Sequence, residues 1–233
     1  MCGYGTGSCV IVNAGDTPIY PACGVNTTVG FSSKGTPHYA LEGVVNYSGA
    51  VVTWLKNSAG LVASPAETGT LAEQANPADK TYMVPAFTGI GAPHWKSEAT
   101  AAYVGMTRLT GKAELVRAAL ESVAYQIGDL VFPSLEAIGA EGKELRVAGG
   151  PSRNRYLMQF QSDILGCPVV IPKNEELSGI GSAYLAGLAL GMYDYDDLMS
   201  RQETTVFHPV MDEAERQERL EGWKHALDVV LRY

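Results

Sequence analysis

The chain has 233 residues, of which 46% are hydrophobic, and a net charge of −8. That apolar content is enough for a sizeable core. The acidic charge argues against a nucleic-acid groove, which needs clustered Lys and Arg. No run of 18 apolar residues predicts a membrane span, and the first residues lack the layout of a secretion signal. We therefore expect a cytoplasmic protein that binds neither nucleic acid nor a membrane.

The chain contains four cysteines, at positions 2, 9, 23 and 167. Their spacing matches no zinc or other metal motif, and disulfides are not expected in so apolar a chain. The sequence therefore predicts reduced, mostly buried thiols and no metal site in this chain.

The first half of the chain begins with short strand patterns. β-Branched and alternating residues predict strands at 7–12, 18–20, 25–31 and 38–41, separated by turns rich in Gly, Asn and Pro. Because these strands follow one another closely, we expect an antiparallel meander. From Val44 the apolar and small residues recur at helical spacing, which predicts a helix that ends near Asn57. A short helix is expected at about 67–75.

The second half alternates between strand and helix patterns. Strands are predicted at 82–87 and 102–106, and an apolar stripe predicts a helix over 112–131 whose extension Pro133 limits. Strands at 145–148 and 168–172 then alternate with helices at 154–165, 178–190, about 194–201 and 211–231. A meander followed by this alternation predicts an α/β fold with a mixed sheet flanked by helices. With no repeat or linker, residues 1–233 are expected to form a single domain.

Three loops of small residues suggest a ligand site. They are Gly5-Thr6-Gly7, the segment from Thr88 to Pro93, and Gly149-Gly150. Glycine lets the backbone approach an oxyanion closely, and a glycine turn before a helix presents N–H groups to negative charge. The first loop alone is also typical of an ordinary hairpin. The last stands between a strand and a helix, as in many nucleotide sites. Together the loops predict a nucleotide polyphosphate held from several sides.

Two roles are open for Asn154, which begins the helix after the last loop. Its side chain could bind an adenine edge or ribose, or it could be the helix N-cap. No Walker lysine motif occurs, and no GxGxxG follows a strand with an acidic partner about 20 residues on.

Longer motifs resemble one family. They are Tyr4-Gly5-Thr6-Gly7, the segment 39–43 (YALEG), the segment 84–95 (VPAFTGIGAPHW), and the pair 101–106 and 114–122 (AAYVGM and ELVRAALES). In this order they resemble the FGGY carbohydrate kinases, and segments 158–166 and 187–189 are most similar to the glycerol kinases of that family. The likeness covers nearly the whole chain.

The resemblance implies an actin-like, ribonuclease-H-like fold and the C-terminal, nucleotide-binding domain of a kinase that uses ATP and Mg²⁺ on a polyol or sugar. It implies nucleotide-binding roles for the following residues: Gly5, Thr6, Gly7, Gly49, Thr53, Gly149, Gly150 and Asn154. Glycerol kinases usually carry glutamine at the position of Thr53. They usually carry phenylalanine at that of Cys9, beside the polyol, so the shorter Cys9 could admit a larger sugar such as xylulose.

The family's catalytic aspartate belongs to a segment upstream of the Tyr4 loop, as do most substrate contacts. We therefore expect no catalytic base in this chain and no kinase activity from it alone. The expected partners are a separate N-terminal kinase domain or a second copy of the chain, because a severed domain face exposes apolar surface. Two alternatives are a non-catalytic nucleotide-binding module, alone or as half of a split kinase, and an actin-like sensor or assembly protein.

Overall fold

The computed structural model describes residues 1–33, 35–173, 177–200 and 202–232. Within this part of the chain, seven strands form one mixed sheet in the order β3-β4-β2-β1-β7-β8-β9. These strands are β1 (Cys2–Tyr4), β2 (Ser8–Gly15), β3 (Asn26–Ser33), β4 (Thr36–Val45), β7 (Leu145–Gly149), β8 (Val169–Pro172) and β9 (Thr204–Phe207). The neighbours β1, β7 and β8 run parallel, and the other pairs are antiparallel. The predicted mixed sheet is confirmed.

The remaining elements surround this sheet. The two short strands β5 (Tyr82–Val84) and β6 (Ala102–Val104) pair separately. The helices are α1 (Gly49–Asn57), α2 (Glu67–Gln74), α3 (Lys112–Ile138), the 3-10 turn η1 (Gly150–Arg153), α4 (Arg155–Leu165), α5 (Leu177–Ala189), α6 (Tyr195–Ser200) and α7 (Glu213–Arg232).

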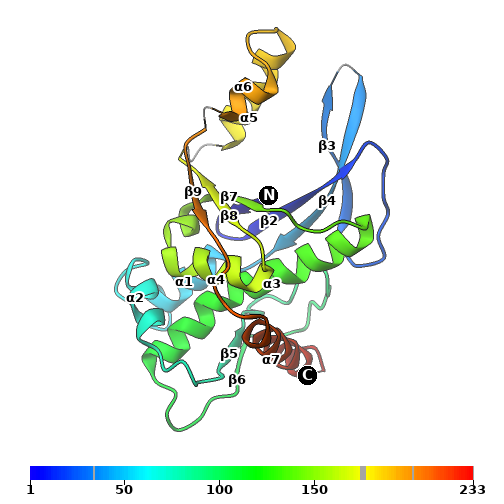
Figure 1. Ribbon diagram of the computed structural model, residues 1–233. Helices are drawn as coiled ribbons and strands as arrows, with labels where there is room; N and C mark the ends of the chain where they lie inside the picture. The colour runs from blue at the N-terminus through cyan, green and yellow to red at the C-terminus, as the bar shows by residue number, and fades with distance from the viewer. Residues whose placement is uncertain (34, 174–176, 201, 233) are drawn as a thin grey trace.

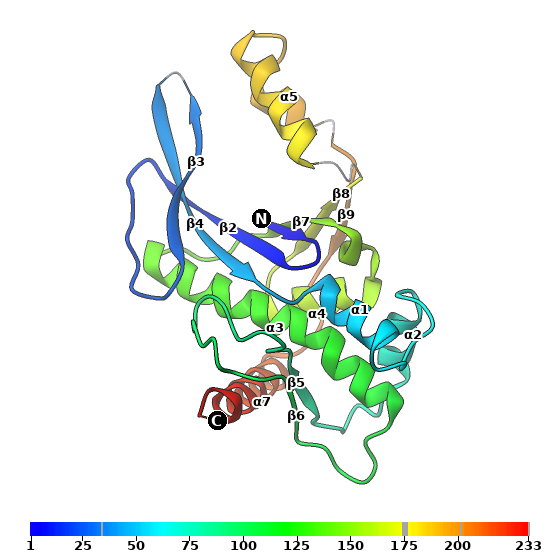
Figure 2. The same ribbon diagram turned by 180° about the vertical axis from the view of Figure 1, so that it is seen from behind.

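The helices are unevenly distributed around the sheet. The long helix α3 crosses beneath it, packing on β2 and β4, and α4 and α7 lie on the same side (Figure 1). α1, α2 and α4 gather around one end of α3, seen from behind in Figure 2. α5 and α6 stand out from the body at its top, beyond β8 and β9.

The main core lies between the sheet and α3, α4 and α7. Side chains that point down from the strands, such as Val10 and Val147, meet Leu120 and Ile127 of α3 and Ile164 of α4. A smaller cluster joins α1 to α3 and β5. The core therefore fixes the ends of β1, β7, α1 and α4 relative to one another.

The order of the first strands differs from the predicted meander. β4 lies between β2 and β3, so β2 and β3 are not neighbours. Residues 18–20 form no strand, because Pro18 within this segment and Pro21 directly after it lack the N–H that a ladder needs. β4 remains paired with β2 up to Val45, so the helix predicted from Val44 begins only at Gly49.

Pro133 does not end the long helix, contrary to the prediction. α3 continues for another turn and stops at Gly139, which takes the left-handed conformation that glycine favours. Leu135 and Ile138 of that turn pack against the main core. The hydroxyl of Ser134 donates 2.6 Å to the carbonyl oxygen of Leu130. Core packing thus outweighs the hydrogen bond that Pro133 removes.

The last part of the chain contains a strand that the sequence reading missed. β9, with the sequence TTVF, pairs with β8 where no element was expected. The β-branched residues of this segment were the available signal. α5, α6 and α7 are present near their predicted positions; position 201, the predicted end of α6, lies outside the described residues.

Glu114 should stabilise the start of α3 in a pH-dependent way. Its carboxylate accepts the N–H of Asn76 at 2.8 Å and the N–H of Gly111 at 2.9 Å. These hydrogen bonds lower the pKa of Glu114, and the bond from Asn76 has the largest effect. We expect Glu114→Gln to lower the unfolding free energy by about 2 kcal/mol at pH 7. Folding favours the ionised form of Glu114. The difference in unfolding free energy between the two proteins should therefore reach its full size above a pH of about 4.3 and shrink as the pH falls below that value.

Urea unfolding of both proteins from pH 7 to pH 3 tests this. The exposed Glu136, on the same helix, serves as the control: Glu136→Gln should change the unfolding free energy by less than about 0.5 kcal/mol at each pH. An equal loss for both variants would contradict the assignment.

Candidate functional site

The turn between β1 and β2 is fastened to the start of α1. The carbonyl oxygen of Thr6 accepts the N–H groups of Ser48 and Ala50, each at 3.0 Å, and that of Gly5 accepts Gly49 N–H at 2.9 Å. A Cβ on Gly49 would lie 2.6 Å from the carbonyl oxygen of Gly5. Glycine is therefore needed here for close approach. The N–H groups of Ser48, Gly49 and Ala50 are thus bonded to the carbonyl oxygens of Gly5 and Thr6.

Gly149 brings the end of β7 against the same turn. It pairs with Tyr4 in the parallel ladder, and its φ of 103° lies in a region that other residues rarely adopt. A Cβ there would lie 1.8 Å from the carbonyl oxygen of Tyr4. The chain then enters η1, whose Pro151 packs beside Gly49. The first and last glycine loops thus meet at one point, as predicted.

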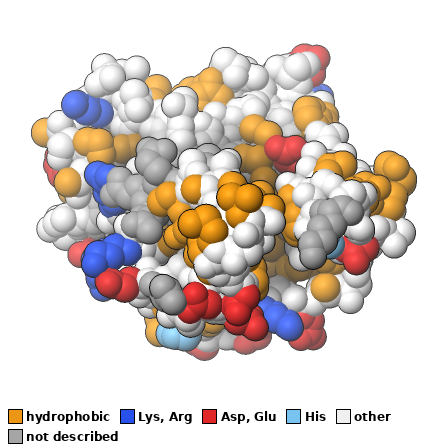
Figure 3. Space-filling model, turned by 90° about the horizontal axis from the view of Figure 1, so that it is seen from above, with side chains coloured by type: hydrophobic (Ala, Val, Ile, Leu, Met, Phe, Trp, Pro, Cys, Tyr) orange, Lys and Arg blue, Asp and Glu red, His pale blue; other side chains and the backbone are white. Residues whose placement is uncertain are grey.

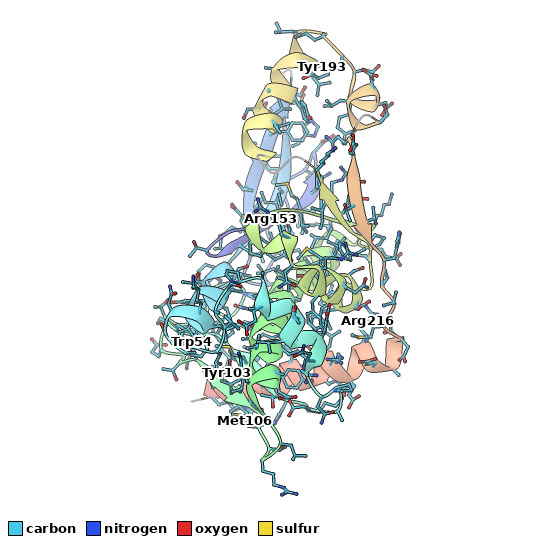
Figure 4. The ribbon with its side chains drawn as sticks, turned by 90° about the vertical axis from the view of Figure 1, so that its left-hand side faces the viewer. Trp54, Tyr103, Met106, Arg153, Tyr193 and Arg216 are labelled. Atoms are coloured by element: carbon cyan, nitrogen blue, oxygen red, sulfur yellow. The ribbon has the colours of Figure 1, made fainter. Side chains whose placement is uncertain are left out.

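A cavity of about 770 Å³ opens beside this meeting point. Its size falls in the range typical of sites for small molecules. Its walls come from α1, the segment before α2, α2 itself, η1 and the first turn of α4. The lining residues are Gly49, Val52, Thr53, Ser64, Pro65, Ala66, Thr68, Gly69, Thr70, Glu73, Leu120, Gly150, Pro151, Arg153, Asn154, Arg155, Tyr156 and Leu157. Figure 4 marks Arg153 near the middle of the molecule.

Asn154 serves as the N-cap of α4 and also lines the cavity. Its Oδ1 accepts the N–H of Leu157 at 3.1 Å, and its Nδ2 donates to Thr68 Oγ1 at 3.0 Å. Thr68 is fully buried and donates to the carbonyl oxygen of Pro65. This chain of hydrogen bonds joins α2 to α4 and so fixes two opposite walls. A helix cap and a cavity wall are therefore compatible roles.

The predicted residues divide into three groups. Gly49, Thr53, Gly150 and Asn154 line the cavity, while Gly5, Thr6, Gly7 and Gly149 adjoin it through the contacts of the turn. Cys9 lies elsewhere, in the middle of the sheet, on the face that also carries Val44 and Glu42. The nucleotide-site prediction therefore describes one connected region, and Cys9 is separate from it.

Burial raises the pKa of the Cys9 thiol to about 11, and the neighbouring carboxylate of Glu42 adds to the shift. The thiol donates to Glu42 Oε1 at 3.2 Å. Cys9 is thus a protonated side chain on a half-exposed surface and is not an activated nucleophile.

The middle glycine loop does not border the large cavity, so the expectation that it helps to hold the same ligand is wrong. Its residues Gly89 to Ala92 line a different, much smaller cavity of about 20 Å³. Trp95 Nε1 donates to the carbonyl oxygen of Gly24 at 2.7 Å, and Tyr47 donates to Thr88 Oγ1 at 3.1 Å. These bonds hold the loop against the segment that follows β4 and the segment before β3.

Sequence reasoning missed most of the wall formed by residues 64–73, and also Arg153, Arg155 and Tyr156. The segment 64–73 lacks a glycine-loop signature, and only the fold brings it opposite α4. For Tyr156 a signal was available: an aromatic residue two positions after a helix N-cap lies in the first turn, beside any ligand at that helix end.

Among the described residues, no three His, Cys, Asp or Glu side chains come together in a way that could hold a metal ion. None of the described helices combines the length and the apolar character needed to cross a bilayer.

Comparison with known proteins gives the family. The model of the FGGY family of carbohydrate kinases, C-terminal domain, matches residues 1–190. The glycerol kinase of Clavibacter michiganensis is 44% identical over 227 residues, which are 96% of this chain and 45% of that protein. The crystal structure of Plasmodium falciparum glycerol kinase with ADP has a TM-score of 0.91 at 35% identity, covering 99% of this chain and 46% of that one.

A gluconate kinase from Lactobacillus acidophilus shares the fold, with a TM-score of 0.85 at 22% identity over 99% of this chain and 47% of that one. The chain belongs to the FGGY family of carbohydrate kinases and has its actin-like, ribonuclease-H-like fold. The predicted resemblance is confirmed. The chain spans 45% of the length of the curated relatives that it matches.

Gly149 should be irreplaceable for folding. We expect Gly149→Ala to lower the unfolding free energy by more than about 3 kcal/mol, because the new Cβ overlaps a backbone oxygen and the φ angle is unfavourable for alanine. Gly150→Ala is the matched control: its Cβ would meet no atom within 4 Å. Thermal melting of the two variants decides the matter, and equal melting temperatures would refute the role given to Gly149.

Proposed function

We propose that this chain is the ATP-binding half of a carbohydrate kinase, similar to glycerol kinases, that transfers the γ-phosphate of ATP to a polyol or sugar hydroxyl. In this proposal residues 1–233 act as one cytoplasmic domain. The observation that carries it is the cavity beside the joined glycine loops, which four of the predicted nucleotide residues line. Family membership and the similarity to a glycerol kinase solved with ADP support the same reading.

The chain's own groups suggest a division of labour. The cavity between α2 and α4 would take the adenosine, and Gly150, which has open space on its Cα, would let the phosphate tail pass close to the backbone. The exposed turn at Thr6 would then lie beside the terminal phosphates, with its hydroxyl as a donor. Gly5 and Gly7 would keep that turn narrow, and Thr53 would border the nucleotide from α1.

The described residues do not fit a metal site of their own. Mg²⁺ is therefore proposed to belong to the reaction as part of the MgATP substrate, with any protein ligands supplied from outside this half. We likewise assign the base that accepts the hydroxyl proton to the other half of the kinase, as the family resemblance implies.

The rest of the kinase is the partner that we propose, as part of the same protein or as a separate chain. The described helices leave the upper face of β2, β3 and β4 bare, and Phe31 and Val44 are exposed on that face. α5, α6 and the turn between them carry further exposed apolar side chains. These are Leu185, Leu190, Met192 and Tyr195. Figure 3 views the molecule from above, where α5 and α6 lie nearest the viewer and hydrophobic side chains gather at the centre. A second copy of the chain is the competing occupant, and exposed apolar surface of this kind favours association.

The acceptor is proposed to be glycerol or a somewhat larger polyol or sugar such as xylulose. Cys9 stands on the bare face of the sheet, and its short side chain leaves more room than the phenylalanine usual in glycerol kinases.

Nucleotide binding is the first test. Calorimetric titration of the chain with MgADP and MgATP should show binding that is weak, because half of the cleft is missing. Gly150→Val should weaken it at least about tenfold without changing the melting temperature, because its side chain would project into the cavity. Gly3→Ala, on an open position of β1 away from the cavity, should bind as the unchanged chain does. No binding by the unchanged chain would refute the proposal.

Phosphoryl transfer is the second test. The chain alone should show no turnover with MgATP and glycerol or xylulose, and adding an N-terminal half of a glycerol kinase should restore it. Comparing the two acceptors in the restored enzyme, with Cys9→Phe beside it, tests the proposed tolerance of a larger sugar. Turnover by the chain alone would contradict the division of roles. Binding without restored turnover would favour a non-catalytic module, and light scattering that rises with ATP would favour an assembly protein.

A further inference from the structure

Tyr156 is an aromatic wall of the large cavity whose hydroxyl has a buried partner. It lies in the first turn of α4, two residues after the N-cap Asn154. Its hydroxyl donates to Glu121 Oε1 at 2.6 Å. Its ring stacks on Phe160, with the two centroids 6.3 Å apart and the planes 6° from parallel. The ring is thus held at its tip and on one face, which leaves few orientations open to it.

Glu121 is a carboxylate with little contact with water. Only 3% of its surface is exposed, and it follows Leu120, another residue of the cavity wall, on α3. Burial raises its pKa, while Arg219 and the Tyr156 hydroxyl act in the opposite direction. Burying a carboxylate without partners costs free energy. Glu121 therefore depends on the hydrogen bond and the positive charges around it.

Two arginines face the same oxygen. Arg219 Nη1 lies 3.6 Å and Arg117 Nε 3.9 Å from Glu121 Oε1. Arg117 is anchored elsewhere, since it donates to the carbonyl oxygens of Asn76 and Asp79 at 2.7 Å each. Arg219 belongs to α7, and its guanidinium also lies over the ring of Phe160.

α7 is itself firmly attached to α3. Trp223 stacks on Tyr125 with centroids 5.1 Å apart, and its Nε1 donates to Asp129 Oδ2 at 2.9 Å. A continuous set of contacts therefore runs from the C-terminal helix, through one buried carboxylate, to the wall of the cavity.

We propose that Glu121 is a positioning residue for the nucleotide site: it holds the Tyr156 ring in the cavity wall through the tyrosine hydroxyl, while Arg219 ties that carboxylate to α7. The inference rests on the proposed function, because it assumes that the large cavity takes the nucleotide. A flat ring in a fixed orientation favours a purine or its ribose at that wall, whereas a ring free to rotate does not. The C-terminal helix, which touches no part of the cavity, then contributes to nucleotide affinity.

The test measures MgADP affinity by calorimetry. Tyr156→Phe keeps the ring and removes its anchor, so we expect affinity to fall about fivefold. The affinity of Glu121→Met should fall by a similar factor. The double variant should bind no more weakly than Glu121→Met alone, because both substitutions break the same contact. Glu121→Gln keeps an acceptor for the hydroxyl and should recover most of the loss. Tyr103→Phe, which removes a tyrosine hydroxyl bond to α3 away from the cavity, should leave affinity unchanged.

Amide hydrogen exchange of residues 154–158 in the chain without nucleotide gives a second readout. Protection there should fall in Tyr156→Phe and Glu121→Met and stay unchanged in Tyr103→Phe. If the unchanged chain binds no MgADP, the proposed function fails, and exchange alone then decides whether Glu121 positions this wall. Unchanged exchange in Tyr156→Phe, or wild-type MgADP affinity in it, would overturn the inference. So would a double variant weakened by the product of the two single effects.

Discussion

The contact between Gly149 and the carbonyl oxygen of Tyr4 is the constraint on which the rest of the site depends. β1 has only three residues, and it is held between β2 and β7. Where it ends, the backbone of β7 must come closer than any side chain allows. This approach sets the β1–β2 turn beside η1, and α1 is then fastened to that turn by its first amides. The β1–β2 turn, the start of α1 and η1 therefore meet at this point, and the cavity opens beside them.

Much of this arrangement follows from patterns that a sequence displays. The apolar stripe of α3 and a helix N-cap at Asn154 are local signals, and both helices begin where they were predicted, although α3 extends beyond its predicted end. Gly149 and Gly150 were recognised because a glycine pair between a strand and a helix has few other uses. The family resemblance added Gly49 and Thr53, which no local pattern marks as part of a cavity.

Other features depend on tertiary packing and could not be read locally. The insertion of β4 between β2 and β3 is decided by long-range pairing, and the passage of α3 through Pro133 by the core beneath its last turn. The wall from Ser64 to Glu73 carries ordinary loop and helix residues, and Thr68 gains its role only from Asn154, 86 positions away. The middle glycine loop shows the opposite error. Its composition suggested a ligand site, but its residues pack the loop against neighbouring segments.

The way in which α1 begins has a mechanical consequence. The carbonyl oxygens of Gly5 and Thr6 accept hydrogen bonds from the first amides of the helix, so the β1–β2 turn is attached to α1. Tilting the helix without moving the turn would break these hydrogen bonds. Any hinge motion of this half against a neighbour that displaces α1 would therefore also displace the β1–β2 turn.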